Sequence, residues 1–426
     1  MKKLIEWKEN NAKTPLMIIG ARQIGKTYII DNFCTQCFKD YVYINLEKNK
    51  EIVDIFKSTI DPEKIISQIE LLINKVITEE TIIFLDEIQE SEEAITSLKY
   101  FCESEKKYKI VTAGSLLGVK LNRFGSSFPV GKVKIIYMYA MDFEEFLLAI
   151  NRKDLALEIR RCYNNMEPIS TPVHELLIDL YRKYICIGGM PSAVLNFIEN
   201  EMNLVKFDKE ILKTIIENYL ADMSKYTLNK SESIKISSIY NKMPAQLAKD
   251  NKKFNYKLIG EYACKRDFKT ALDWLISSNL LYKCPLVTTI QIPLKAYIDD
   301  DIFKMYLSDV GLLISMCEIE FSDIILNKDF LFKGAITENY VAQTFVANGK
   351  SIYYWKSKSE AEMDFILYNQ EGIIPVEVKA NDNVQSKSLN SYIKRYNPSY
   401  AIRLSLKNFG YENKIKSIPL YAAYLI

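Results

Sequence analysis

The sequence predicts an α/β protein in which a parallel, helix-covered sheet is followed by helical regions and then by a second α/β region. Between residues 15 and 147, short β-branched segments alternate with helical stretches, which is the pattern of a parallel sheet. Helical patterns dominate from residue 151 to about 280, and beyond residue 325 helix and strand patterns alternate again. Because 426 residues exceed what one hydrophobic core usually supports, we expect several domains.

The first predicted strand runs directly into the loop GARQIGKT at residues 20–27, which leads into a helix at a Lys-Thr pair. Glycines in such a loop let the backbone fold around a phosphate with its N–H groups pointing inward, so the pattern predicts a P-loop for ATP. Lys26 would reach the β- and γ-phosphates, and the Thr27 hydroxyl would hold Mg²⁺. The residues expected to line the nucleotide are Gly20, Ala21, Gln23, Ile24, Gly25, Lys26, Thr27, Tyr28 and Ser115.

Acidic residues follow another predicted strand of this region. The five strands are expected at residues 15–20, 41–47, 81–87, 109–115 and 132–141. Asp86 would orient Mg²⁺, and Glu87 would act as the catalytic base that polarises the attacking water. The strand at 109–115 would lie between the P-loop strand and the acidic strand. Thr112 or Ser115 would then act as a sensor beside the γ-phosphate, or these hydroxyls merely end a strand or cap a helix.

The composition of the chain argues against a zinc site and against a membrane protein. The formal net charge is +2, so any basic surface must be local, and eight cysteines with one histidine make a zinc site improbable. We interpret Cys34 and Cys37 as half-buried thiols on the helix after the P-loop, and His174 as a surface or capping residue. No apolar run is long enough for a membrane span or a signal peptide, so we expect a soluble, cytoplasmic protein without a membrane partner.

The middle of the chain predicts a helical lid or connector and then a winged helix. The connector helices are interrupted at residues 187–191, where Gly-Gly-Met-Pro predicts a tight bend. Helical patterns at 233–243, 245–251 and 267–280 precede two predicted strands at 280–286 and 292–298, which is the winged-helix order. Lysines outnumber acids nearby, which indicates either DNA contact or a solvated surface. These lysines are at positions 225, 230, 235, 242, 249, 252, 253 and 257.

A second set of candidate catalytic residues lies near the C-terminus. A predicted helix at 334–349 carries Glu338, and a predicted hairpin carries Asp364 on one strand and Glu377 and Lys379 on the other. Alternate residues of a strand share a face, so Glu377 and Lys379 would point the same way and Asp364 would lie beside them. Two carboxylates and a lysine arranged in this way can hold Mg²⁺ against a phosphodiester and activate a water. Alternatively, Glu377 and Lys379 form an ion pair on an edge strand.

This constellation resembles the PD-(D/E)XK nuclease superfamily, which has a restriction-endonuclease-like α/β fold. The resemblance implies that Asp364 and Glu377 are the two acids, that Lys379 is the lysine and that Glu338 is the helix acid, with Glu362 as a nearby further carboxylate. It also implies that Glu338, Asp364 and Glu377 are metal ligands and that Asp364, Glu377 and Lys379 are catalytic.

The chain as a whole resembles a prokaryotic family of AAA-type ATP-binding proteins whose C-terminal module combines a winged helix with this nuclease-like fold. The resemblance rests on the P-loop, on IIFLDEIQE, TAGS and SFPVGKVKIIYMYAMDFEEFL, and on later segments such as YICIGGMPSAV and FKMYLSDVGLL. It implies ATP and Mg²⁺ at Gly20, Gly25, Lys26, Thr27, Asp86 and Glu87. Many relatives have an arginine before the fifth strand, where this chain has Gly131-Lys132, and lysine cannot replace a bidentate guanidinium. Arg123 is the candidate substitute.

Four domains are therefore expected: a P-loop ATPase at 1–150, a helical connector at 151–215, a winged helix at 216–320 and a nuclease-like domain at 321–426. The leading hypothesis is an ATPase whose nucleotide state controls a DNA-associated, nucleolytic C-terminal region. The rival is a nucleotide-dependent regulatory protein whose nuclease-like domain is inactive and binds protein or DNA. A third hypothesis is a homo-oligomeric ring motor, which the missing arginine disfavours.

Overall fold

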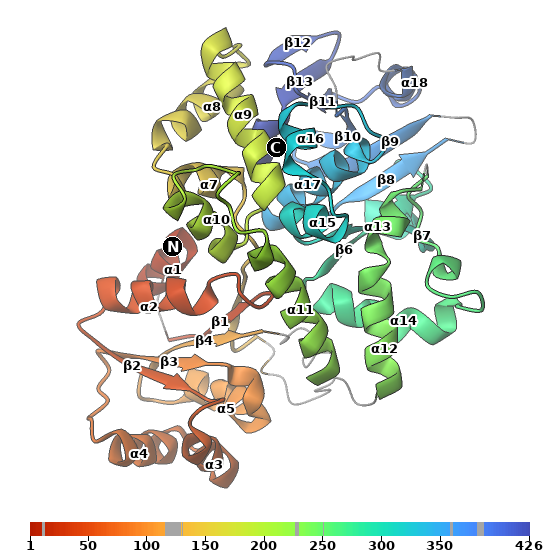
Figure 1. Cartoon of the computed structure of the whole chain (residues 1–426). Coiled ribbons are helices and arrows are strands. Elements are labelled where there is room, and N and C mark those ends of the chain that lie inside the picture. Colours follow the sequence, from red (N-terminus) through yellow and green to blue (C-terminus); the bar gives the residue numbers. More distant parts are fainter. Residues whose placement is uncertain are drawn as a thin grey trace. The chain divides into compact units, whose positions relative to one another are not determined.

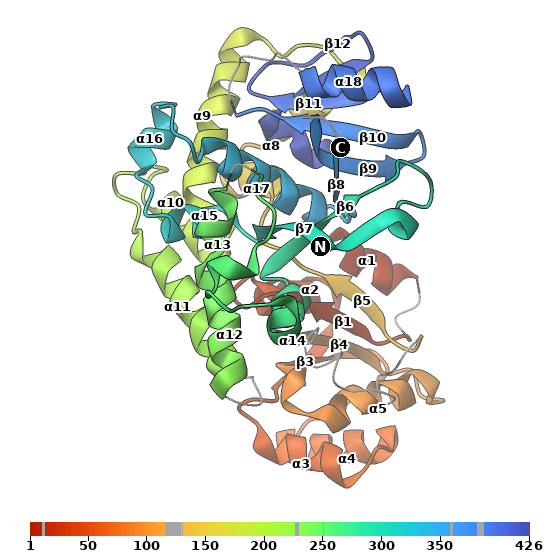
Figure 2. The ribbon, with the colours of Figure 1, turned by 90° about the vertical axis from the view of Figure 1, so that its right-hand side faces the viewer.

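The computed structural model of the chain is shown in two views in Figures 1 and 2. It describes residues 1–10, 13–115, 129, 131–225, 230–249, 251–357, 361–380 and 387–426. The chain divides into two units. Unit 1 contains residues 1–139 and 277–279, and unit 2 contains residues 140–276 and 280–426. Arg123, the candidate arginine finger, lies outside the described residues.

Unit 1 contains the predicted parallel sheet. Its strands are β1 (Leu16–Ile19), β2 (Asp40–Asn45), β3 (Thr81–Asp86), β4 (Lys109–Gly114) and β5 (Lys134–Tyr137). Their spatial order is β2-β3-β4-β1-β5, and each neighbouring pair is parallel. The five strands are thus confirmed, and β4 lies between the P-loop strand and the acidic strand as predicted. The helices in the described part of this unit are α1 (Lys2–Glu9), α2 (Lys26–Cys37), α3 (Lys50–Ser58), α4 (Pro62–Ile73), the 3-10 turn η1 (Ile88–Glu90) and α5 (Glu92–Glu103).

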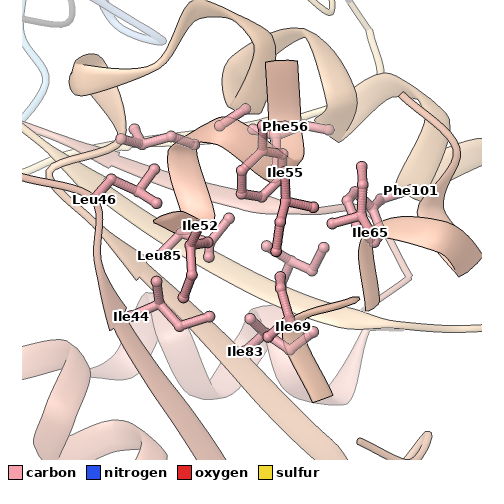
Figure 3. Close-up of a cluster of buried hydrophobic side chains, with 14 of the residues drawn as sticks. Ile44, Leu46, Ile52, Ile55, Phe56, Ile65, Ile69, Ile83, Leu85 and Phe101 are labelled. Carbon is pink, nitrogen blue, oxygen red and sulfur yellow. The ribbon is translucent and has the colours of Figure 1, made fainter. Parts of the chain in front are cut away.

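Both faces of this sheet are buried at the inner strands β1, β3 and β4. Ile83 and Leu85 of β3 point to one face, where they join side chains of α3, α4 and α5 such as Phe56 (Figure 3). Ile82 and Phe84 point to the other face, against α1 and α2. Burial on both faces explains why β3 is a continuous apolar run rather than an alternating pattern. Both cysteines lie on α2 as predicted, and Cys37 is half-buried, but Cys34 is fully buried, which corrects the prediction for that thiol.

The first half of unit 2 is helical, as predicted. Its helices are α7 (Phe143–Ala149), α8 (Lys153–Asn165), α9 (Thr171–Ile187), α10 (Pro191–Glu199), α11 (Glu210–Lys225), α12 (Lys230–Asn241), α13 (Met243–Leu247), the turn η3 (Tyr256–Leu258) and α14 (Lys265–Ser277). The predicted bend separates α9 from α10. A Cβ on Gly188 would lie 2.1 Å from Oδ1 of Asp309, and a Cβ on Gly189 would lie 1.9 Å from the carbonyl oxygen of Met141. Only glycine fits this close approach.

The second half of unit 2 is built on an eight-stranded mixed sheet with the order β12-β13-β11-β10-β9-β8-β6-β7 (Figure 2). The strands are β6 (Leu281–Val287), β7 (Ile298–Leu307), β8 (Tyr353–Lys356), β9 (Glu362–Asn369), β10 (Gly372–Val378), β11 (Ala401–Ser405), β12 (Gly410–Glu412) and β13 (Ile415–Pro419). The accompanying helices are the turn η4 (Leu294–Tyr297), α15 (Val310–Met316), α16 (Phe321–Ile325), α17 (Lys333–Ala347), α18 (Lys387–Tyr396) and the turn η5 (Leu420–Leu425).

Two sequence predictions for this unit are corrected. The second strand of the predicted wing is β7, so the strand expected at 292–298 is wrong, and most of that segment forms η4. His174 is neither a surface nor a capping residue, because its ring nitrogens lie 2.7 Å from the Tyr421 hydroxyl and 3.0 Å from the Leu406 carbonyl oxygen. The order of three helices and an antiparallel strand pair is present, but β6 also pairs with β8, so one sheet continues across the predicted boundary at residue 320. The winged helix and the domain boundaries stay predictions.

Within the described part of the chain, the helices lack the combination of length and apolar character that crossing a bilayer requires.

Candidate functional sites

The loop between β1 and α2 has the backbone that a phosphate cradle needs. Gly25 is the N-cap of α2 with φ of 84°, a left-handed conformation that glycine adopts without strain. Having no side chain, it leaves the first N–H groups of the helix available to an anion. A Cβ on Gly20 would lie 2.3 Å from the carbonyl oxygen of Met138, so that position also requires glycine. Ala21 and Ile24 are buried beneath the loop, whereas Gln23 and Tyr28 are exposed.

Lys26 is buried inside this loop. Its Nζ donates hydrogen bonds to the carbonyl oxygens of Gly20 at 3.1 Å and Ala21 at 2.7 Å. Burial lowers its pKa to about 8, although the negative charges of Glu87 and Asp86 oppose the shift. Its partners in the loop are therefore neutral oxygens, which a phosphate can replace as stronger acceptors.

Asp86, at the end of β3, is surrounded by hydroxyl groups. The Thr27 hydroxyl donates to Oδ2 of Asp86 at 3.0 Å, and the Tyr43 hydroxyl donates to the same oxygen at 3.0 Å. The N–H of Glu87 donates to Oδ1 at 3.0 Å. A hydroxyl and a carboxylate in contact, backed by neutral donors, fit a Mg²⁺ that keeps several of its waters. Tyr43 was not predicted from the sequence, although it lies on β2, the strand paired with β3.

Glu87 directly follows β3 and has a left-handed backbone with φ of 51°. A left-handed glutamate costs on the order of 1 kcal/mol, so the surrounding structure must hold it. The buried side chain of Gln89 does this in part, because its Nε2 donates to Oε2 of Glu87. The turn therefore directs the predicted base away from the strand, and Gln89 is a positioning residue that the sequence did not reveal.

The end of β4 meets the P-loop through a side chain that was also missed. Arg22 donates from Nε to Oγ of Ser115 at 3.3 Å. Of the two predicted sensors, Ser115 therefore contacts the P-loop, whereas Thr112 is fully buried within β4 and its Oγ1 has no partner among the described residues. In the turn before β5, Lys132 forms a 3.1 Å ion pair with Glu103.

The C-terminal candidates come together on β9 and β10 of unit 2. The antiparallel register pairs Val376 with Phe365, which brings Asp364 beside Glu377 one residue further along. Oδ2 of Asp364 accepts the N–H of Val378 at 2.7 Å, and Nζ of Lys379 lies 3.2 Å from Oε1 of Glu377. Glu377 is buried, and its Oε2 has no hydrogen-bond partner in the part of the chain that the structure describes. This orphaned oxygen and Asp364 fit a Mg²⁺ held by two carboxylates and water.

Glu338, on the adjacent helix α17, is instead paired with lysines. Lys252 forms an ion pair with its Oε1, Nζ of Lys304 lies 3.9 Å from its Oε2, and the Tyr306 hydroxyl donates to Oε2 at 3.3 Å. Lys304 also lies 2.7 Å from Oε1 of Glu362. Within the described residues, the structure holds no group of three acidic, histidine or cysteine side chains arranged for a metal ion. The expected three-acid ligand set is therefore not assembled.

The lysines also set the protonation of this centre. Burial alone would raise the pKa of Glu338, but the charges of Lys304 and Lys252 outweigh it and lower that pKa. Burial and the charge of Glu338 raise the pKa of Asp364 to about 7. Lys252 was predicted to belong to a basic surface, and this is corrected, since its side chain is mostly buried against Glu338. Lys304 was not predicted at all.

Solved structures with a similar chain trace include a Walker-type ATPase of Pyrococcus abyssi, with 15% sequence identity, a TM-score of 0.45, and coverage of 74% of this chain and 94% of the other. The ORC2 protein of Aeropyrum pernix gives 14% identity, a TM-score of 0.38, and 77% and 92% coverage. The RuvB Holliday junction branch migration motor of Thermotoga maritima has 14% sequence identity and a TM-score of 0.31, with coverage of 67% of this chain and 88% of the other. A search of curated proteins found no match.

Three family models match successive parts of the sequence. Residues 178–323 match a domain of unknown function (DUF8612), and residues 333–423 match another (DUF4143). Residues 12–147 match a family described as an AAA domain. This match covers the strands, the phosphate cradle and the acidic turn described above. The N-terminal region of the chain is therefore similar to AAA domains, and the P-loop and the acidic turn both lie inside the matched range.

Proposed function

We propose that this protein binds ATP with Mg²⁺ at the P-loop and hydrolyses it, and that its nucleotide state controls a C-terminal region that engages DNA. The observation that carries the ATPase proposal is the set of groups around Asp86 and Lys26. Thr27 and Tyr43 donate hydroxyls to Asp86, and the hydrogen bonds that Lys26 forms within the described residues go to carbonyl oxygens. A neutral hydrogen-bond partner does not cancel the charge of the group that it holds, so the carboxylate is open to a metal ion and the ammonium to a phosphate.

Each residue has a role in this proposal. Lys26 would exchange its carbonyl partners for β- and γ-phosphate oxygens, helped by the N–H groups at the start of α2. Thr27 and Asp86 would hold Mg²⁺, which neutralises charge on the transferred phosphoryl group. Glu87 would orient the attacking water, and Ser115 would contact the γ-phosphate with Arg22 beside it.

The experiment that tests the ATPase proposal is phosphate release by the purified chain with ATP and Mg²⁺, together with binding of a fluorescent ATP analogue. Lys26→Ala should abolish both binding and turnover. Lys8→Ala is the matched control, because Lys8 is an exposed lysine of the same unit whose Nζ also donates to a carbonyl oxygen, that of Cys37. Phosphate release that persists in Lys26→Ala would contradict the proposal.

A second candidate function, metal-dependent cleavage of a phosphodiester, is favoured by the juxtaposition of Asp364, Glu377 and Lys379. Asp364 and Glu377 would hold one Mg²⁺, and Lys379 would position a water for attack on phosphorus. As the water oxygen bonds to phosphorus it releases a proton to the solvent, the ester P–O bond breaks, and the leaving alkoxide takes up a proton from the solvent to become the alcohol. The alternative is an inactive centre that recognises DNA or a protein, and the lysines on Glu338 support that alternative.

Cleavage of supercoiled and linear DNA with Mg²⁺ or Mn²⁺, with and without ATP, separates these functions. Nicking that is lost in Asp364→Ala would support the nuclease, and a change in nicking in Lys26→Ala would support control by nucleotide. Intact ATP hydrolysis without any cleavage would favour the inactive binding module. Size-exclusion chromatography with and without ATP would test for a homo-oligomer.

A further inference from the structure

The carboxylates around α17, β9 and β10 fall into two groups according to their partners. Glu338 and Glu362 are bound by ammonium groups, whereas Asp364 accepts a backbone N–H and, among the described residues, forms no ion pair. Glu377 is intermediate, since one oxygen meets Lys379 and the other has no partner in the described part of the chain. The positive charge in this centre is therefore distributed unevenly.

Lys304 is the most constrained of the cations. It is 1% exposed on β7, its Nζ lies between Glu362 and Glu338, and it also lies 5.0 Å from the centre of the Tyr354 ring. A buried ammonium is costly unless carboxylates compensate it, and removing it would leave those carboxylates uncompensated. Lys304 is thus a fixed positive charge rather than a mobile surface group.

Lys252 is held by its backbone. The segment after α13 runs alongside β7, where Lys253 forms a bridge with Lys304 and the N–H of Phe254 donates to the carbonyl oxygen of Phe303 at 2.9 Å. Gln246 further fixes the segment through reciprocal hydrogen bonds with the backbone of Asn255, at 2.8 and 2.9 Å. These contacts aim Lys252 at Glu338, so its position is also built into the fold.

We infer that Lys304 and Lys252 act as built-in cations at the place where a second metal ion would bind, so that this centre takes a single divalent cation, held by Asp364 and Glu377. Two-metal phosphodiester enzymes use a pair of ions to stabilise the attacking and the leaving oxygens. Here a second ion would have to displace a buried ammonium from its carboxylates. This inference rests on the metal site of the proposed function.

Counting bound Mn²⁺ by calorimetry and electron paramagnetic resonance tests the inference without relying on activity. The full chain is used without nucleotide and with Asp86→Asn, which removes the P-loop ligand. We expect one ion per chain, and its loss in Asp364→Asn. Lys304→Met and Lys252→Met should each admit a second ion, whereas Lys257→Met, which alters an exposed lysine of the same segment, should not.

The possible outcomes are distinct. Two ions at the centre before any lysine is changed, or a single ion that persists in both lysine variants, would overturn the inference while leaving the metal site intact. No ion in any variant would overturn the metal site itself, and the inference with it. Lys252→Met keeps the test decisive if Lys304→Met does not fold, because Lys252 is less buried and circular dichroism reports whether each variant is folded.

Discussion

The P-loop site and the C-terminal centre both place acids near lysines, but they compensate those acids in different ways. Asp86 is held by two hydroxyls and Glu87 by a side-chain amide, all of them neutral donors. Glu338 is held by Lys252 and Lys304, which are cations. A neutral donor fixes the geometry of a carboxylate and leaves its charge for an incoming cation, whereas a lysine fixes the geometry and cancels the charge. The partners of an acid therefore indicate whether it is prepared for a metal ion.

The largest expected effect concerns Glu87, whose partner is the neutral side-chain amide of Gln89. Glu87→Gln keeps the size and polarity of the side chain but removes the proposed base, so we expect ATP turnover to fall by about 10²- to 10⁴-fold while ATP binding is retained. Steady-state phosphate release and nucleotide titration measure the two quantities. Glu90→Gln is the control, since Glu90 faces Lys50 at 3.8 Å and should change turnover little. Equal losses in the two variants would remove the distinction between Glu87 and a structural acid.

The second prediction concerns Lys304 in the C-terminal centre, where the acids have lysine partners. Lys304→Met removes a buried cation from between two carboxylates, and we expect the free energy of unfolding to fall by about 3–5 kcal/mol. Lys328→Met removes an exposed lysine from its 2.7 Å pair with Asp323 and should cost less than about 1 kcal/mol. Urea denaturation followed by tryptophan fluorescence compares the two. Similar losses would mean that Lys304 is no more than a surface ion pair.

The elements that carry both sites could be predicted from the sequence. GARQIGKT follows an apolar run and combines glycines with a Lys-Thr pair, whereas IIFLDE is an apolar run that ends in two acids. The first segment forms the loop between β1 and the start of α2, and the second forms β3 and the turn after it, as these patterns indicate. In the second site, β9 and β10 form the predicted hairpin. The strand at 292–298 was misplaced because the first residue of β7, Ile298, is followed by Asp299, Asp300 and Asp301, and aspartate is depleted in strands.

The partners of the acids could not be predicted in the same way. Lys304 is separated from Glu338 by 34 positions and from Glu362 by 58, and in the sequence it is an ordinary lysine in a strand. Its burial depends on carboxylates that only the folded sheet and α17 bring together. Tyr43 likewise meets Asp86 only because β2 pairs with β3. Local patterns therefore reveal the candidate acids, and tertiary structure decides how their charges are compensated.

A third kind of acid extends the comparison. Asp309 is fully buried and accepts N–H groups of Gly189 at 2.7 Å and Leu312 at 3.0 Å, and it forms no ion pair with a lysine of the described residues. Burial raises its pKa from 3.8 to about 6, although these hydrogen bonds oppose the shift. Between those two values the unfolded chain has lost the proton that the folded chain still binds, so stability falls as the pH rises through this window and then levels off.

Asp309→Asn tests that sign. The variant cannot ionise, so the stability of the wild type relative to the variant should decline by about 1–3 kcal/mol between pH 4 and pH 7. Urea denaturation of both proteins at several pH values gives this difference directly, and groups shared by the two proteins cancel. A difference that is flat or rises with pH would show that the backbone N–H groups compensate Asp309 as fully as the lysines compensate Glu338.

The smallest expected effect tests whether a neutral donor prepares an acid for a metal ion. Tyr43→Phe removes one hydroxyl from Asp86 and keeps the ring, which packs 5.2 Å from that of Phe84. A hydrogen bond to a charged group contributes about 1–2 kcal/mol, and Thr27 remains, so we expect the Mg²⁺ concentration for half-maximal ATP turnover to rise about 3- to 10-fold with little change in the maximal rate. The control is Tyr41→Phe, a change on the same strand as Tyr43, which removes a 2.7 Å hydrogen bond to Asp31 of α2. If Tyr43→Phe instead lowers the requirement for Mg²⁺, the hydroxyl competes with the ion for the carboxylate, and the neutral partners of this site would resemble the lysines of the other.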